Sequence, residues 1–174
     1  MKELLLKDCV GVNNLVIESS SLESIWYESH AYNDKRHVNI SCDRLEKLHF
    51  NAPIGGKTDR LVNISAPNLK YLEWFGEFMT RLNLGNLMCL EKAETSSSFM
   101  TCNFDGLFDF LCSIRKVKVL ILHPDIVERL WLNCDYWKSK EISFISQAKE
   151  VVIQYQCRSY VIEFAYYILG HAHD

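Results

Sequence analysis

Side chains of the kinds that carry out nucleophilic catalysis lie close together in the sequence at His30, Asp34, His37 and Cys42. A thiol and an imidazole are sufficient for acyl transfer when they lie within hydrogen-bond reach of each other. Here they occupy a turn and the short extended segment after it, with no glycine-framed nucleophile and no second motif. We interpret them as solvated loop residues, and we expect that the protein is not an enzyme.

Two other short patterns resemble parts of ligand-binding motifs. His171 and His173 are metal-ligand types, but no third ligand accompanies them, and a frayed tail explains them better. The segment GGKT at 55–58 matches the end of a phosphate-binding loop, but the glycine four residues earlier is absent and no helical pattern follows. We therefore expect neither a metal nor another cofactor.

Composition and charge argue against several partners and compartments. The 174 residues carry a net charge of -3 without a cluster of Lys or Arg, which argues against nucleic acid and anionic membranes as partners. The first residues, MKELLLKDC, contain three consecutive leucines, and this apolar segment is too short for a secretory signal. No apolar run approaches the roughly 18 residues of a membrane span. Seven scattered cysteines without a C-x-x-C pair favour reduced, mostly buried thiols. We expect a cytoplasmic or nuclear protein whose sequons at Asn39 and Asn63 stay unmodified.

The stretch VNISAPNLKYLEW, residues 62–74, contains a frame that the chain repeats every 23 or 24 residues. The frame is an x-I pair, a corner, and an L-x-x-L-x-aromatic segment. It occurs at Val62, Ile64, Leu69, Leu72 and Trp74; at Val38, Ile40, Leu45, Leu48 and Phe50; and at Leu15, Ile17, Leu22, Ile25 and Tyr27. Such a period is typical of leucine-rich repeats, whose stacked units bury a continuous core. We predict an α/β leucine-rich-repeat solenoid, a horseshoe with parallel inner strands, short outer strands and a few helices near the C-terminal half.

The repeat also predicts where the elements lie. Alternation puts the leucines of each inner strand inside, so that Leu48 and Leu72 should lie on neighbouring strands. Helical spacing at 104–114 and 160–170 predicts two helices, the second a C-terminal cap. Residues 125–130 are either a short helical turn or part of a compressed unit. The inner strands are expected near 4–6, 24–27, 47–50, 71–74, 118–122 and 150–154, and a looser fifth unit at Leu82, Leu84, Leu90, Ala93 and Thr95.

Several of these stretches resemble plant F-box proteins. LKDCVGVNNLVIESSSLESI, SAPNLKYLEWFG and IRKVKVLIL are similar to their leucine-rich region, and AKEVVIQYQCRSYVIEFAYYILGHA resembles the start of the FBD region that closes many of them. The resemblance implies leucine-rich repeats over 1–147 and a partial FBD-like strand and capping helix over 148–174, continuous with the solenoid. Such proteins are substrate receptors of SCF-type cullin ubiquitin ligases, in which the repeats hold the target and the F-box holds a Skp-type adaptor.

The resemblance therefore implies a protein-recognition module similar to the substrate-binding region of such a receptor. These 174 residues contain no F-box pattern, so we expect a Skp-type adaptor as a partner only if an upstream F-box exists. The alternative is a scaffolding or decoy leucine-rich-repeat protein that recruits no ligase, and an immune-receptor repeat fragment is a third possibility. Because the first strand begins at residue one without a cap, we also expect self-association.

Each inner strand presents one outward side chain between its two inward leucines, at Leu5, Trp26, His49, Glu73, Glu94 and Ile121. Since neighbouring strands lie about 4.8 Å apart, these side chains should form one concave surface. Exposed aromatic rings with charges beside them are typical of protein-binding patches. We predict that a target protein binds this face at Trp26, His49, Tyr71, Glu73, Phe75 and Ile121.

Overall fold

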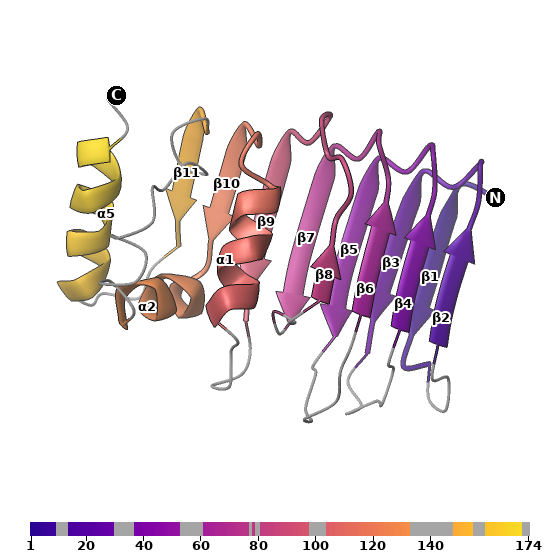
Figure 1. Cartoon of the computed structure of the whole chain (residues 1–174), viewed down its shortest axis with the longest axis horizontal. Coiled ribbons are helices and arrows are strands. Elements are labelled where there is room, and N and C mark those ends of the chain that lie inside the picture. The colour runs from indigo at the N-terminus through magenta and orange to yellow at the C-terminus, as the bar shows by residue number, and fades with distance from the viewer. Residues whose placement is uncertain are drawn as a thin grey trace.

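A computed structural model describes residues 1–9, 14–29, 37–52, 61–76, 78, 81–97, 104–132, 148–154 and 159–171. In these ranges two parallel sheets stack as a solenoid of about 4 turns, with three helices (Figure 1). The chain alternates between the two sheets from β1 to β9, so each turn of the solenoid contributes one strand to each sheet. The α/β solenoid predicted from the repeat is confirmed at this level.

The larger sheet has seven strands in the order β1-β3-β5-β7-β9-β10-β11. Leu48 pairs directly with Leu72, as the repeat predicted, and β9 belongs to the looser fifth unit. The last strand joins the same sheet by pairing with β10. The strands are β1 Glu3–Lys7, β3 Ser24–Glu28, β5 Lys47–Ala52, β7 Tyr71–Gly76, β9 Lys92–Ser96, β10 Val119–Leu122 and β11 Glu150–Ile153.

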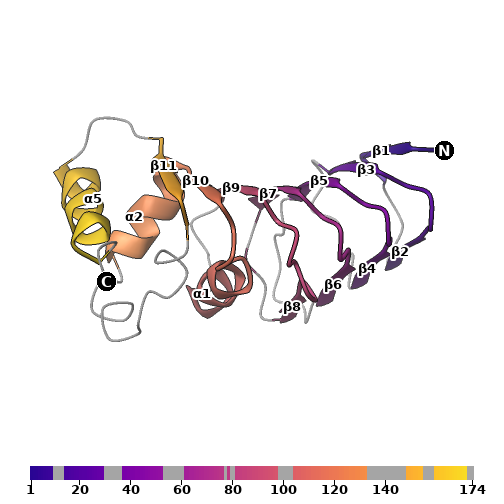
Figure 2. The ribbon, with the colours of Figure 1, turned by 90° about the horizontal axis from the view of Figure 1, so that it is seen from above.

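The smaller sheet has four strands in the order β2-β4-β6-β8, of which the first three are built from the x-I pairs. Figure 2 shows this sheet and the first helix on one side of the molecule and the seven-stranded sheet on the other, bent so that its outward face is concave. The strands are β2 Asn14–Glu18, β4 His37–Ser41, β6 Leu61–Ser65 and β8 Arg81–Asn83.

The core lies between the two sheets, because strict alternation directs every second side chain inward. In β7 the burial alternates from exposed Tyr71 to buried Leu72, half-buried Glu73 and buried Trp74. The aromatic position of the frame forms a stack inside, in which the ring centroids of Phe50 and Trp74 lie 4.5 Å apart. The first and last inward positions, Leu4 and Val151, are only partly buried, because each lies on a terminal strand with a neighbour on one side.

The corner between the two sheets is closed by the first leucine of the L-x-x-L segment. The N–H of Leu45 donates to the carbonyl of Cys42, and the N–H of Leu69 donates to the carbonyl of Ala66. Both leucines are fully buried. Successive corners are also bonded to each other, since the Asn68 side-chain amide donates to the carbonyl of Asp43 at 2.7 Å. The repeated corner therefore links successive turns of the solenoid.

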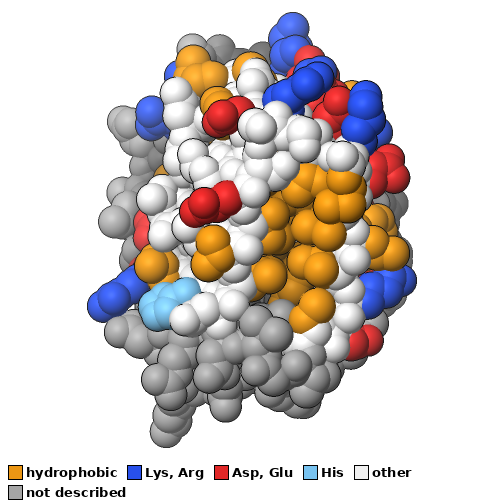
Figure 3. Space-filling model, turned by 90° about the vertical axis from the view of Figure 1, so that its right-hand side faces the viewer, with side chains coloured by type: hydrophobic (Ala, Val, Ile, Leu, Met, Phe, Trp, Pro, Cys, Tyr) orange, Lys and Arg blue, Asp and Glu red, His pale blue; other side chains and the backbone are white. Residues whose placement is uncertain are grey.

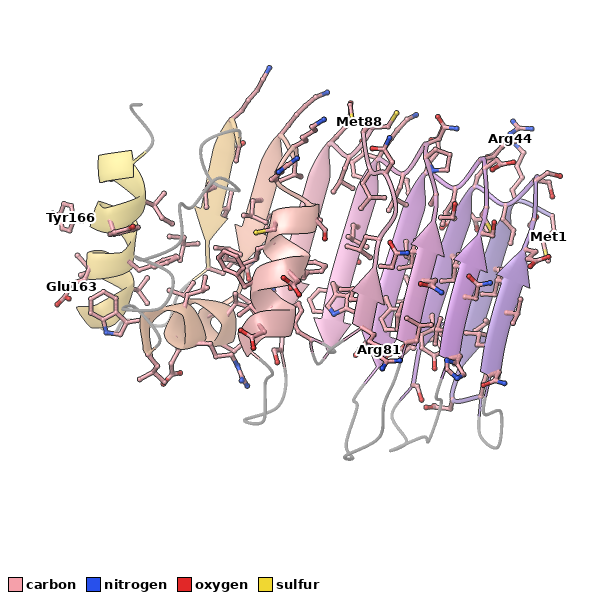
Figure 4. The ribbon with its side chains drawn as sticks, viewed as in Figure 1. Met1, Arg44, Arg81, Met88, Glu163 and Tyr166 are labelled. Carbon is pink, nitrogen blue, oxygen red and sulfur yellow. The ribbon has the colours of Figure 1, made fainter. Side chains whose placement is uncertain are left out.

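Helices replace the outer strands in the last third of the chain. α1, Phe104–Ser113, covers the core after β8, and it buries Phe110 against Trp74 and Phe78. Residues 125–130 were predicted to be either a short helical turn or part of a compressed unit. They belong to a helix, α2, Pro124–Leu132. α5, Ser159–His171, packs beside α2 at the C-terminal end and directs Glu163 and Tyr166 away from the sheets (Figure 4). None of the described helices is long and apolar enough to span a membrane.

The cysteines that the structure describes differ in how far they are buried. Among the described cysteines, Cys42 is buried, Cys9 and Cys112 are half-buried, and Cys89 is exposed. The exposed Cys89 lies in the corner between β8 and β9, where the fifth unit is one residue longer and the frame is weakest.

Candidate protein-binding surface

The outward side chains predicted for the concave face form one row across the seven-stranded sheet. Register places Leu5 beside Trp26, Trp26 beside His49 and His49 beside Glu73. The row continues through Glu94, Ile121 and Val152. We name the surface formed by Trp26, His49, Tyr71, Glu73, Phe75 and their immediate neighbours the concave patch.

Three rings of the concave patch support one another. The imidazole of His49 stacks on the indole of Trp26, with centroids 3.5 Å apart and an interplanar angle of 10°. On its other side His49 contacts Phe75 at 5.4 Å, and Phe75 in turn meets His123 edge-on at 5.6 Å. Stacked and edge-on pairs at these distances are favourable beyond the area that they bury. The exposed indole is therefore held in place by rings on neighbouring strands.

Two histidine–carboxylate contacts fix the polar side chains of this surface. His49 Nδ1 lies 2.6 Å from Glu73 Oε2, and His123 Nε2 lies 2.9 Å from Glu94 Oε1. Because each carboxylate only accepts, the histidine nitrogen that faces it carries the proton and donates. The second nitrogen of His49, Nε2, is buried and has no hydrogen-bond partner in the described part of the chain. Glu73 thus sets the tautomer and orientation of the ring that supports Trp26.

A groove of about 320 Å³ lies over the middle of the sheet, between the rings of Trp26 and Tyr71. Trp26 on β3 is 41% exposed and Tyr71 on β7 is 39% exposed, and the intervening strand β5 forms the floor. Lys47 lies over the Tyr71 ring, with Nζ 5.7 Å from its centroid. The lining is Ser24, Ile25, Trp26, Lys47, Leu48, His49, Tyr71, Leu72, Glu73, Lys92 and Glu94. Aromatic walls with mixed charges suit an extended peptide or a protein loop.

Sequence reasoning missed Lys92, which lies beside Tyr71 in the sheet and lines the groove. The fifth unit is one residue longer through its corner, so its sequence matches the frame less closely than those of the other units. Ala93 pairs with Leu72, and this correspondence is the signal that would have placed Lys92 beside Tyr71.

Three of the predicted surface residues are less accessible than expected. The side chain of His49 is only 11% exposed because the Trp26 indole covers it, and Phe75 is half-buried between two histidines. Ile121 was expected to be exposed, but it is buried at 9%. Glu94 and Val152 flank Ile121 on the two neighbouring strands, and Glu94 reaches past it to His123. Accessible binding area therefore concentrates at Trp26, Tyr71 and Glu73.

The other candidate sites gain no support from the described residues. Cys42 is buried, and this burial raises the pKa of its thiol, which is unfavourable for a nucleophile. Its proposed companions at 30 and 34 lie outside the described residues, as do the GGKT segment and His173. Within the described ranges, no three His, Cys, Asp or Glu side chains are grouped to hold a metal ion.

Comparison of the chain with protein-family models, with curated proteins and with solved structures finds no match.

Proposed function

We propose that this chain is a leucine-rich-repeat recognition module that binds a target protein through the concave patch. The observation that carries the proposal is the groove between Trp26 and Tyr71, whose two rings stay exposed although the frame around them is buried. Partly exposed, preorganised aromatic side chains contribute much of the energy at protein interfaces, because few rotamers are lost when they are covered.

The contacts that hold the Trp26 ring in place favour a binding role for this side chain over exposure by chance. Its ring rests on His49, and its Nε1 donates to Glu28 at 3.3 Å, so its orientation is set before a partner arrives. Preorganisation lowers the entropy that binding must overcome. The carboxylate of Glu73 and the ammonium of Lys92 lie beside the aromatic walls and would orient polar groups of the target.

Within this proposal, the resemblance to plant F-box proteins makes the target a substrate of an SCF-type ubiquitin ligase. The module would then act in the cytoplasm or nucleus, and a Skp-type adaptor would be a partner only through an upstream F-box. No segment of these 174 residues resembles an F-box. The chain alone should therefore hold the target and not the adaptor, and a scaffolding or decoy role without a ligase is the alternative use of the same surface.

The test is affinity capture from plant extract followed by quantitative mass spectrometry and a binding measurement with the purified partner. Trp26→Ala combined with Tyr71→Ala should abolish capture and leave the far-UV circular dichroism unchanged, since neither side chain belongs to the core. The matched control replaces two exposed apolar side chains elsewhere, Met88→Ala and Leu132→Ala, and should capture normally. Capture that survives the first pair of substitutions would refute the concave patch as the binding site, and stoichiometric adaptor on this chain would refute our placement of ligase recruitment.

A further inference from the structure

The first strand of the large sheet offers one edge for further pairing. In the described part of the chain β1 pairs only with β3, and it stands at the end of the strand order. The carbonyl of Lys2 accepts from the N–H of Ser24, and the N–H of Asp8 donates to the carbonyl of Glu28. Backbone groups of successive residues in a strand point to opposite edges. Those of Glu3, Leu5 and Lys7 therefore point away from β3.

These three residues form a self-complementary edge. If a second β1 lies antiparallel and centred on Leu5, Leu5 faces its own copy and Glu3 faces Lys7 of the other copy on both sides of the centre. All three facing pairs then have their N–H and C=O groups directed at each other, as in the hydrogen-bonded pairs of an antiparallel ladder. Registers centred on Leu4 or Leu6 would also direct these groups at the partner, but they would place Glu3 or Lys7 opposite Leu5, so only the register centred on Leu5 pairs Glu3 with Lys7.

Charge and burial favour the same register. Lys7 already contacts Glu28 of β3 at 3.4 Å, and the second copy would place the Glu3 carboxylate on its other side. Opposite charges on directly facing residues stabilise a strand pair, and like charges destabilise it. Leu5 is 62% exposed, and Leu4 and Leu6 are only partly buried. Pairing would bring Leu5 against Leu5 on the concave face and Leu4 against Leu6 on the core face.

The smaller sheet ends with the same arrangement at β2. The N–H of Ser19 donates to the carbonyl of Ser41 on β4, so the backbone groups of Asn14, Val16 and Glu18 point outward. Antiparallel pairing centred on Val16 places Asn14 opposite Glu18, a pair without like charges. Both sheets end on the same face of the molecule, where a broad hydrophobic area is exposed (Figure 3) and where Met1 lies (Figure 4).

We propose that the occupant of this face is a second copy of the chain, joined by a two-fold axis through Leu5 with β1 antiparallel to β1. A two-fold interface is closed, so assembly stops at the dimer. The row Leu5–Trp26–His49 would continue into the same row of the second copy, and the two concave patches would lie on one face of a continuous sheet. The dimer does not depend on the proposed function, and its test uses no target protein.

Sedimentation equilibrium of the chain, with circular dichroism as the check on folding, tests the charge pairing. The unsubstituted chain should dimerise. Glu3→Lys turns two attractive pairs into repulsive ones and should weaken the dimer by about tenfold. Combining it with Lys7→Glu restores opposite charges and should recover most of this loss. A monomer at all concentrations, an unchanged dimer in Glu3→Lys, or growth beyond the dimer would overturn the proposal.

Disulfide trapping tests the register. In Leu5→Cys the two Cα atoms would lie about 5.5 Å apart, within the range that a disulfide spans. The matched control Glu3→Cys lies on the same face of the same strand, but its two copies would be separated by about 14 Å along the strands. Oxidation should link Leu5→Cys and leave Glu3→Cys at the background of the unsubstituted chain. Equal linking of the two variants, or no linking of either, would refute this register.

Discussion

The imidazole of His49 lies flat beneath the indole of Trp26, 3.5 Å from centroid to centroid, although the two residues are on different strands. Register places them side by side on β3 and β5, and the contact buries a histidine that the sequence left on the surface. The exposed indole therefore serves two purposes, since it covers His49 and forms one wall of the groove.

This cover predicts a change in the chemical reactivity of His49. Trp26→Ala should increase the rate at which diethyl pyrocarbonate modifies His49 by several-fold, because the indole that covers the ring is removed. Peptide mapping by mass spectrometry measures this rate. His37, which is exposed on the other sheet, should react equally in both proteins and provides the internal control. Equal His49 rates in the two proteins would show that the indole does not protect the ring.

The core packing predicts a large cost for Leu72→Ala. Leu72 is buried between its pairs Leu48 and Ala93, so truncation leaves a cavity and should lower the free energy of unfolding by about 2–5 kcal/mol. Leu132→Ala removes an exposed leucine and should change the free energy of unfolding by less than about 0.5 kcal/mol. Urea titration measures both, and similar small effects in the two variants would contradict the stacked core.

The ion pair between Glu91 and Lys118 predicts an acid-dependent contribution to stability. The Lys118 ammonium donates to the Glu91 carboxylate at 2.9 Å and holds the pKa of that carboxyl below its usual 4.5. A lowered carboxyl pKa means that the stabilisation is present above 4.5 and is lost as the pH falls through the folded-state value. The stability difference between the wild type and Glu91→Gln should therefore be largest near neutral pH and shrink in acid.

Urea titrations at about pH 7 and at about pH 3 measure this difference, on either side of the usual carboxyl range. Both side chains are solvent-exposed, so added salt should reduce the effect. Lys118→Met removes the other partner and should reduce the acid dependence in the same way. A difference that grows as the pH falls would contradict the assignment.

The turn between β8 and β9 predicts that Gly85 resists substitution. Its φ of +56° is strained for any residue with a Cβ, and a Cβ there would lie 3.0 Å from the carbonyl oxygen of Ile64. Gly85→Ala should therefore destabilise the fold by about 1–2 kcal/mol. Asn86→Ala, at the next exposed position, should be nearly neutral. Thermal unfolding compares the two variants, and equal melting temperatures would contradict the strain.

Sequence periodicity by itself determined the strands and their register. The frame repeats every 23 or 24 residues, and each unit can bury its leucines only against the same positions of its neighbours. For that reason Leu48 pairs with Leu72, and Trp26 pairs with His49, as the frame predicted. Period and alternation are local properties of the chain, so they can be read without knowing any contact.

Only the tertiary structure decided how accessible each outward side chain is. His49, Phe75 and Ile121 occupy outward positions equivalent to exposed ones, yet rings or a carboxylate from other strands cover them. The partial burial of Leu4 likewise reflects its terminal strand and not its place in the frame. Such coverage depends on the rotamers of side chains about one repeat away in the sequence. The alternation within one strand does not specify these rotamers, so the groove between Trp26 and Tyr71 forms only when the strands are assembled.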